Sequence, residues 1–146
     1  MATFQFRLER VLEWYRTQLQ LEENRLAVCL AALNRVEERI ARLQAERLGV
    51  EREVIASAKL AARDLTALGL YRLQAKKQTA VMEEERTRRE RARREQTAAV
   101  QRAQRRVRLV EKLRERRLSE HLYIENRALE TLASEAYLSK WIAERR

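Results

Sequence analysis

The sequence predicts an all-α protein, a long two-helix antiparallel coiled-coil hairpin that forms a single coiled-coil domain over residues 1–146. Three observations lead to this fold. Residues that break helices are nearly absent, with two Gly and no Pro in 146 residues. Strong helix formers such as Arg, Glu, Leu and Ala dominate the chain. Apolar residues recur with a seven-residue period, which requires a partner helix.

We expect the first helix over about residues 4–60. From Leu8 the apolar residues advance in alternating steps of four and three, and 12 of the 14 positions along this seam are apolar. Glu22 and Arg47 interrupt the seam, and we expect each to reach past it with its aliphatic stem buried. The seam of the first helix consists of Leu8, Leu12, Tyr15, Leu19, Glu22, Leu26, Cys29, Leu33, Val36, Ile40, Leu43, Arg47, Val50 and Val54.

The chain reversal is expected at about residues 61–70, where the periodic pattern loosens. Asp64 or Thr66 could cap a helix start there, and Gly69 can adopt positive backbone angles. A turn centred near residue 66 places Leu8 opposite the neighbourhood of Ile124. The last 15 to 20 residues should then project past the N-terminus.

The second helix is expected over about residues 71–143. Residues 83–96 contain almost no apolar residue, but acids precede arginines by four positions, which supports a solvated helix. A seam returns at Ala103, Val107 and Val110, and a stutter through Arg114 shifts its frame. The shifted seam consists of Leu118, Leu122, Glu125, Leu129, Leu132 and Ala136.

Charge is unevenly distributed along the second helix. The chain has a net charge of +10, and residues 83–117 carry 14 bases and seven acids. We expect a basic surface at Arg88, Arg91 and Arg94 that favours an acidic partner. Binding to nucleic acid is an alternative, although acids lie among these arginines and no aromatic residue is available for base stacking. Adsorption to anionic lipid would need bulky apolar residues on the same face.

The sequence offers little for catalysis or for a cofactor. It contains one histidine, His121, and one cysteine, Cys29, which are too few for a zinc site of the usual four ligands. No phosphate-binding loop or nucleophile motif occurs. We therefore expect a protein that is not an enzyme, binds no cofactor or metal and acts in the cytoplasm by binding other proteins.

Two further groups of apolar residues lie outside the seam. Trp14, Leu21 and Val28 recur every seven residues on the first helix, where either packing against the C-terminal residues or a partner could cover them. The second group lies near the expected turn, where a local cluster and a docking surface explain it about equally well. It consists of Leu68, Leu70, Tyr71 and Leu73.

Both ends of the chain resemble the flagellar type III export protein family FliJ. The N-terminal run FQFRLERVLEWYRTQLQLEENRLAVCLAAL begins with a Phe-x-x-Arg-Leu-x-x-Val-Leu pattern. The later run VRLVEKLRERRLSEHLYIENRALETLASEAYLSKW is similar to the second signature of the family. Its Glu-Lys-Leu-x-x-Arg-Arg core matches Glu111, Lys112, Leu113, Arg116 and Arg117.

The resemblance implies a stalk similar to the two-helix stalk of the rotary ATP synthase gamma subunit. Members of the family insert into the hexameric export ATPase, contact the cytoplasmic domain of the membrane export gate and interact with export chaperones. It implies no binding to nucleic acid and only a peripheral position at the cell membrane. The equivalent stalk of a virulence type III secretion system, or a basic coiled coil that binds nucleic acid, is the alternative.

We assign the expected surfaces of such a stalk as follows. The gate-binding surface is the apolar group near the turn, and the ATPase-binding surface is the open end of the hairpin with the outer stripe of the first helix. The ATPase-binding residues are Phe4, Phe6, Trp14, Leu21, Val28, Tyr137 and Trp141. The free protein is expected to be a monomer, and the geometric alternative is a parallel dimer that would place two Cys29 side chains together.

Overall fold

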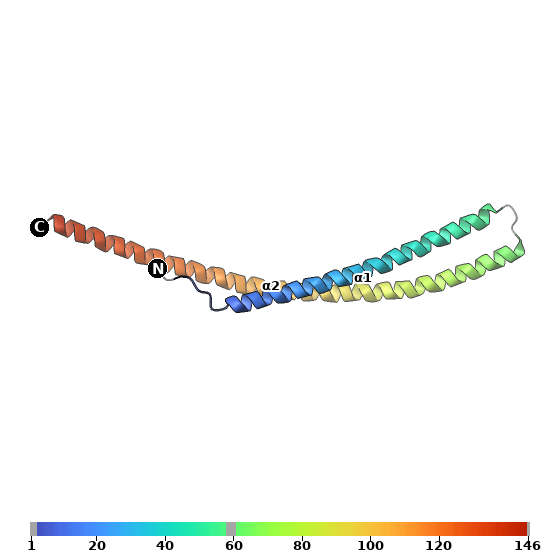
Figure 1. The fold of residues 1–146 in the computed structure, drawn as a ribbon, viewed down its shortest axis with the longest axis horizontal. Coiled ribbons are helices and arrows are strands. Elements are labelled where there is room, and N and C mark those ends of the chain that lie inside the picture. Colours follow the sequence, from blue (N-terminus) through green and yellow to red (C-terminus); the bar gives the residue numbers. More distant parts are fainter. Residues whose placement is uncertain (1–2, 58–60, 146) are drawn as a thin grey trace. The chain divides into compact units, whose positions relative to one another are not determined.

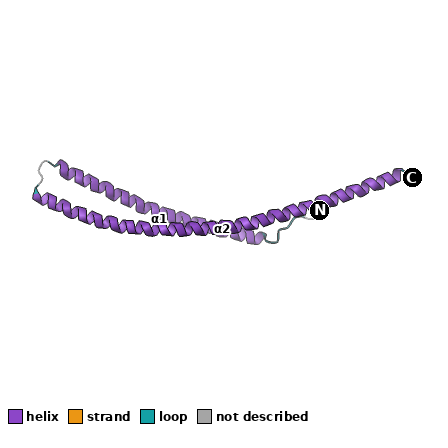
Figure 2. Cartoon of the chain, turned by 180° about the vertical axis from the view of Figure 1, so that it is seen from behind, coloured by secondary structure: helices purple, strands orange, loops and turns teal. Residues whose placement is uncertain are grey.

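The computed structural model describes residues 3–57 and 61–145, and the described residues form two long helices (Figures 1 and 2). Helix α1 spans Glu9–Ala56 and has 48 residues, and helix α2 spans Ala62–Glu144 and has 83. No strand occurs among the described residues. The predicted all-α helical hairpin is therefore confirmed.

The contacts divide the chain into two units, each made from both arms of the hairpin. We call Met1–Leu19 with Arg102–Arg146 the terminal unit, and Gln20–Gln101 the middle unit. The packing of each unit is described separately below.

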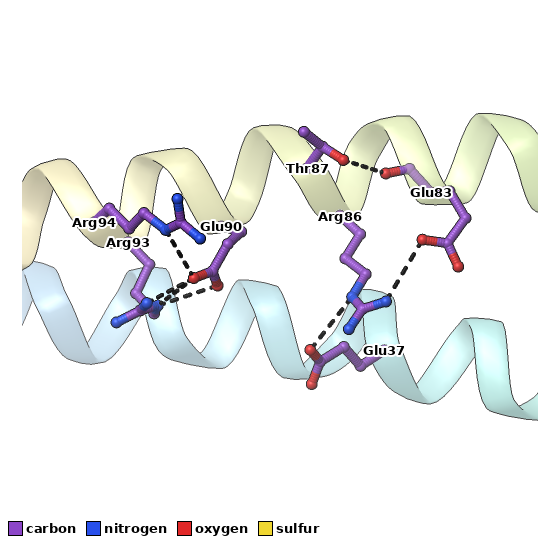
Figure 3. Close-up of polar contacts among 7 residues, drawn as sticks. All are labelled: Glu37, Glu83, Arg86, Thr87, Glu90, Arg93 and Arg94. Carbon is purple, nitrogen blue, oxygen red and sulfur yellow. Dashed lines mark hydrogen bonds and ion pairs between the residues drawn. The ribbon is translucent and has the colours of Figure 1, made fainter.

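Ion pairs between the arms establish the antiparallel register of the middle unit. The Arg72 Nε lies 3.0 Å from Glu51 Oε1. The Arg86 Nε lies 3.5 Å from Glu37 Oε1 (Figure 3). The two acids are separated by two heptads on α1, and the two arginines are separated by two heptads in the opposite direction on α2. The arms of the middle unit therefore run antiparallel with a common seven-residue repeat.

The terminal unit is antiparallel as well and contains a small apolar core. Leu12 is fully buried and packs with Val107 and Val110 of α2. An ion pair joins Arg114 Nε to Glu9 Oε2 at 3.0 Å. Arg114 therefore contacts α1 at the position where the sequence predicted the stutter.

The seam predicted on the first helix is the face that α1 turns towards α2. Every seam position from Leu12 to Val54 is buried or half-buried, and only Leu8 is exposed. The predicted seam residues Ala103, Val107 and Val110 of α2 are buried too. The seven-residue period therefore identified the packed face of α1 and of residues 103–110 of α2, whereas Leu122, Leu129, Leu132 and Ala136 of the shifted seam are exposed.

Glu22 differs from what the sequence predicted. Instead of only extending past the seam, Glu22 accepts hydrogen bonds from Gln96 Nε2 of the opposite arm, at both its backbone carbonyl and its carboxylate. Arg25 Nη1 also donates to the Glu22 carboxylate at 2.9 Å. The polar stretch of α2 thus meets a polar seam residue of α1, and hydrogen bonds join the two side chains.

The prediction that the turn lies at about residues 61–70 was wrong. Helix α2 begins at Ala62, and Gly69 lies inside it without a positive φ angle. The Asp64 side chain instead marks the start of α2, because its Oδ2 accepts a hydrogen bond from the Ala61 backbone N–H at 3.2 Å. A carboxylate near a helix N-terminus stabilises unpaired N–H groups, and this favours the earlier start.

The first helix also begins later than the predicted residue 4. Phe4 and Phe6 are half-buried, whereas Thr3, Gln5 and Arg7 between and beside them are exposed, which is the alternation of an extended segment. Helix α1 begins at Glu9, whose N–H donates to the Phe6 carbonyl at 3.1 Å.

The earlier turn changes which residues lie opposite each other. Leu8 lies with Leu113 and Arg117 around a shallow groove, rather than opposite Ile124. The Phe4 ring lies 5.5 Å from the His121 ring. All side chains over residues 126–145 are exposed, so the prediction of a projecting end of α2 holds within the terminal unit.

Candidate partner-binding surfaces

Two of the aromatic residues assigned to ATPase binding make contacts within the terminal unit. Phe6 packs against the apolar core around Leu12, and the Phe4 ring lies against His121. Because both rings are half-buried by the chain itself, they offer less surface to a partner than the sequence suggested.

The outer face of α1 presents the predicted apolar residues to solvent. Trp14 of the terminal unit is 56% exposed, and its ring lies 5.4 Å from the neighbouring Tyr15 ring. In the middle unit, Leu21 and Val28 are also exposed, Val28 at 69%. The described side chains of this stripe are therefore exposed to solvent.

The C-terminal part of α2 carries the largest group of exposed apolar side chains in the terminal unit. Tyr137 is exposed, and so is Trp141, whose ring contacts the Arg145 guanidinium at 3.9 Å from the ring centroid. The predicted seam continues through this part, but α1 supplies no side chains to cover it. The exposed apolar residues are Leu122, Tyr123, Ile124, Leu129, Leu132, Tyr137, Leu138, Trp141 and Ile142.

The four residues assigned to gate binding do not share one surface. Leu68 is only 8% exposed and faces the other arm, as a seam residue does. Leu70 and Leu73 are 66% and 52% exposed, and Tyr71 is half-buried. The structure thus places Leu68 in the packing between the arms and leaves Leu70 and Leu73 for a partner.

Neighbouring acids form ion pairs with most of the arginines of the predicted basic surface. The Arg91 Nε lies 3.2 Å from Glu95 Oε1. The Arg94 Nε lies 3.3 Å from Glu90 Oε1 (Figure 3). The hydrogen bond from Arg93 is the main cause that lowers the pKa of Glu90, and it outweighs the opposing effect of burial. Arg88 is exposed. Two of the three predicted bases therefore carry an ion-paired acid beside them.

A second basic face, farther along α2, was not singled out from the sequence. Six exposed bases follow one another here, and none of them forms an ion pair within the part of the chain that the structure describes. The sequence signal is the lack of acids three or four residues away from the first three of these bases. We call this the α2 basic face, and it consists of Arg102, Arg105, Arg106, Arg108, Lys112 and Arg116.

The chemically active side chains are dispersed. His121 Nε2 lies 3.2 Å from Glu125 Oε1 one turn away, and Cys29 is a half-buried seam residue of the middle unit. Over residues 3–57 and 61–145, no group of three or more His, Cys, Asp or Glu side chains could hold a metal ion. Neither α1 nor α2, as described, contains a segment long and apolar enough to cross a membrane.

Comparison of the chain with protein-family models, with curated proteins and with solved structures finds no match.

Proposed function

We propose that this protein is a stalk-like component of the flagellar type III protein export apparatus. In this role it binds the hexameric export ATPase, the export gate and export chaperones, peripherally at the inner face of the cell membrane, and promotes protein export. The proposal rests on the resemblance of both ends of the chain to the FliJ family. The fold agrees with a two-helix stalk.

Among the structural observations, the exposed end of α2 gives the proposal the most support. In the terminal unit, α2 continues for about 20 residues after its last half-buried side chain, Glu125, and these residues carry exposed aromatic rings. Exposed Tyr and Trp side chains are frequent anchors of protein interfaces, because each buries a large area at a small cost in conformational entropy. A stalk that enters a ring by the end carrying both termini would place these rings in the interface.

The two tryptophans give a direct test. Trp14 is 56% exposed and Trp141 43%, so a large part of each side chain is open to a partner in the free protein. Trp14→Ala combined with Trp141→Ala should weaken binding to the purified export ATPase hexamer by about 2 kcal/mol, or roughly 30-fold, as hot-spot truncations do. Fluorescence anisotropy with labelled protein measures this affinity.

Two controls make the result specific. The melting temperature of the double variant should equal that of the parent protein, and its affinity for the export gate should be unchanged. Leu70→Ala with Leu73→Ala, near the turn, should show the opposite pattern and weaken binding to the gate. A double tryptophan variant that melts earlier and loses all its partners together would mean that the rings stabilise the fold and are not binding residues.

A further inference from the structure

The α2 basic face is unusual in containing no acidic residue. Residues 83–95 of the same helix hold six bases and five acids, whereas residues 96–117 hold eight bases and two acids. Of those two acids, Glu111 pairs with Arg16 of α1 at 3.2 Å. The other, Glu115, lies three residues after Lys112, but none of the six bases forms an ion pair among the described residues.

The charge on this face does not stabilise the helix. Arg102 and Arg106 are four residues apart, as are Arg108 and Lys112, and Lys112 and Arg116. Like charges at this spacing repel each other and destabilise a helix, and the repulsion is relieved when an opposite charge binds. In residues 83–95 of the same helix, acids lie four residues from arginines and form ion pairs with them.

An apolar side chain lies in the middle of the basic face. Leu109 is 71% exposed and lies four residues after Arg105 and three before Lys112. The face extends from Arg102 to Arg116 over about 21 Å at 1.5 Å per residue. It therefore presents a line of positive charge, about four helical turns long, with one leucine near its centre.

We propose that the α2 basic face binds an acidic amphipathic α-helix of a partner protein. The bases recur every three or four residues, so a helix lying alongside can place carboxylates against them with the same period. An apolar residue in the partner helix would cover Leu109. The contact does not depend on the export function proposed above.

Other anionic partners fit the face less well. A nucleic-acid backbone would satisfy the arginines but would leave Leu109 uncovered, and no aromatic residue lies between Arg102 and Arg116 for base stacking. An anionic membrane binds helices whose polar face is accompanied by several bulky apolar residues, and here Leu109 is the one large apolar side chain exposed over residues 102–117.

The test uses the full-length protein and synthetic probes. The first probe is a 21-residue helical peptide with Glu at every third or fourth position along one face and a central Leu. The second has the same composition in scrambled order, so that the acids surround the helix. We expect the patterned peptide to bind at least tenfold more tightly than the scrambled one in fluorescence anisotropy, and its affinity to fall as salt is raised.

Two matched variants locate the binding site. Arg102→Gln with Arg105→Gln and Lys112→Gln should weaken binding of the patterned peptide at least tenfold. Arg89→Gln with Arg91→Gln and Arg94→Gln removes the same amount of charge from bases that already have acidic partners, and it should change binding less than twofold. Leu109→Ser should weaken binding of the peptide about threefold or more.

Several results would overturn the proposal. Equal binding of the two peptides, or equal losses in the two triple variants, would indicate attraction by net charge alone. Tighter binding of a 20-base-pair DNA duplex than of the peptide, insensitive to Leu109→Ser, would identify a phosphate-binding face. Tighter binding of phosphatidylserine vesicles than of the peptide would identify a lipid-binding face.

Discussion

At Glu51, one carboxylate of α1 accepts hydrogen bonds from two arginines on different arms. Arg72 Nε of α2 donates to Glu51 Oε1 at 3.0 Å, and Arg47 Nε of α1 donates to the same oxygen at 3.4 Å. Burial raises the pKa of Glu51, but the hydrogen bonds and charges of Arg72 and Arg47 together lower it from 4.5. The charged carboxylate is therefore more favourable in the folded than in the unfolded protein.

This pKa shift predicts how Glu51→Gln responds to pH. Because the folded-state pKa is lowered, the stabilisation is present above the unfolded-state pKa and is lost as pH falls through the folded-state pKa. Glu51→Gln should therefore lower the melting temperature at pH 7, and the difference from the parent should shrink below about pH 4.5. Circular dichroism melts at several pH values measure it. Glu53→Gln, an exposed acid of the same helix, should have little effect at either pH, and a pH-independent loss at Glu51 would contradict the argument.

At the scale of the helices, ion pairs between the arms follow the heptad repeat. Glu9, Glu37 and Glu51 of α1 pair with Arg114, Arg86 and Arg72 of α2, one pair in the terminal unit and two in the middle unit. Every spacing between these acids is a multiple of seven residues and matches the spacing between the arginines. A register slip of one heptad would preserve the apolar seam over most of its length, but it would separate each acid from its arginine. We infer that the pairs help to select one register.

A charge exchange tests this selection in the middle unit. Glu37→Arg or Arg86→Glu alone should place like charges opposite each other and lower stability, whereas the double exchange should restore most of the loss. Both side chains are about half exposed, so the coupling in a double-mutant cycle should be small, roughly 0.2–1 kcal/mol. Urea denaturation measures it. Additive losses would show that the pair does not contribute to the register.

The sequence predicted correctly those features of the helices that rest on a long repeated pattern, and it misplaced those that rest on a single residue. The seam of α1 could be predicted residue by residue, because a repeat sustained over many turns has one interpretation. The reversal lies earlier than the loosened pattern and Gly69 indicate, because Asp64 marks the start of α2, and the capping role of a single acid depends on the exact helix start. Residues on the two arms are paired by counting outward from the turn. A displacement of the turn therefore changes the expected register by about twice that displacement.

The binding surfaces were only partly predictable for a different reason. Exposure of Trp14, Val28 and Trp141 followed from their positions outside the seam that α1 and α2 share. The burial of Leu68 depended on the register, and the packing of Phe4 depended on the extended N-terminal segment. The α2 basic face is indicated by the spacing of acids around Arg102, Arg105 and Arg106, but the net charge of residues 83–117 taken as a whole does not show it.

At the scale of the whole molecule, each arm of the chain covers the seam residues of the other arm along most of the seam. Cys29 is half-buried at a seam position of the middle unit, where α2 of the same chain is its partner. A parallel dimer would instead place two Cys29 side chains together and would require the arms to separate. The exposed seam residues over 122–136 are the one stretch of the predicted seam where α1 offers no partner.

Cysteine crosslinking distinguishes these arrangements. We expect the free protein at low micromolar concentration to have the mass of one chain, 17.4 kDa, by sedimentation equilibrium. Cys29 should form little intermolecular disulfide under mild oxidation, because its own α2 arm covers it in part. Cys29→Ser with Ala136→Cys moves the thiol to the exposed seam and reports on pairing of that stretch alone. Efficient crosslinking through Cys29, together with the mass of a dimer, would favour the parallel dimer. Crosslinking through residue 136 alone would show that the hairpin persists and that the C-terminal parts of two α2 helices associate.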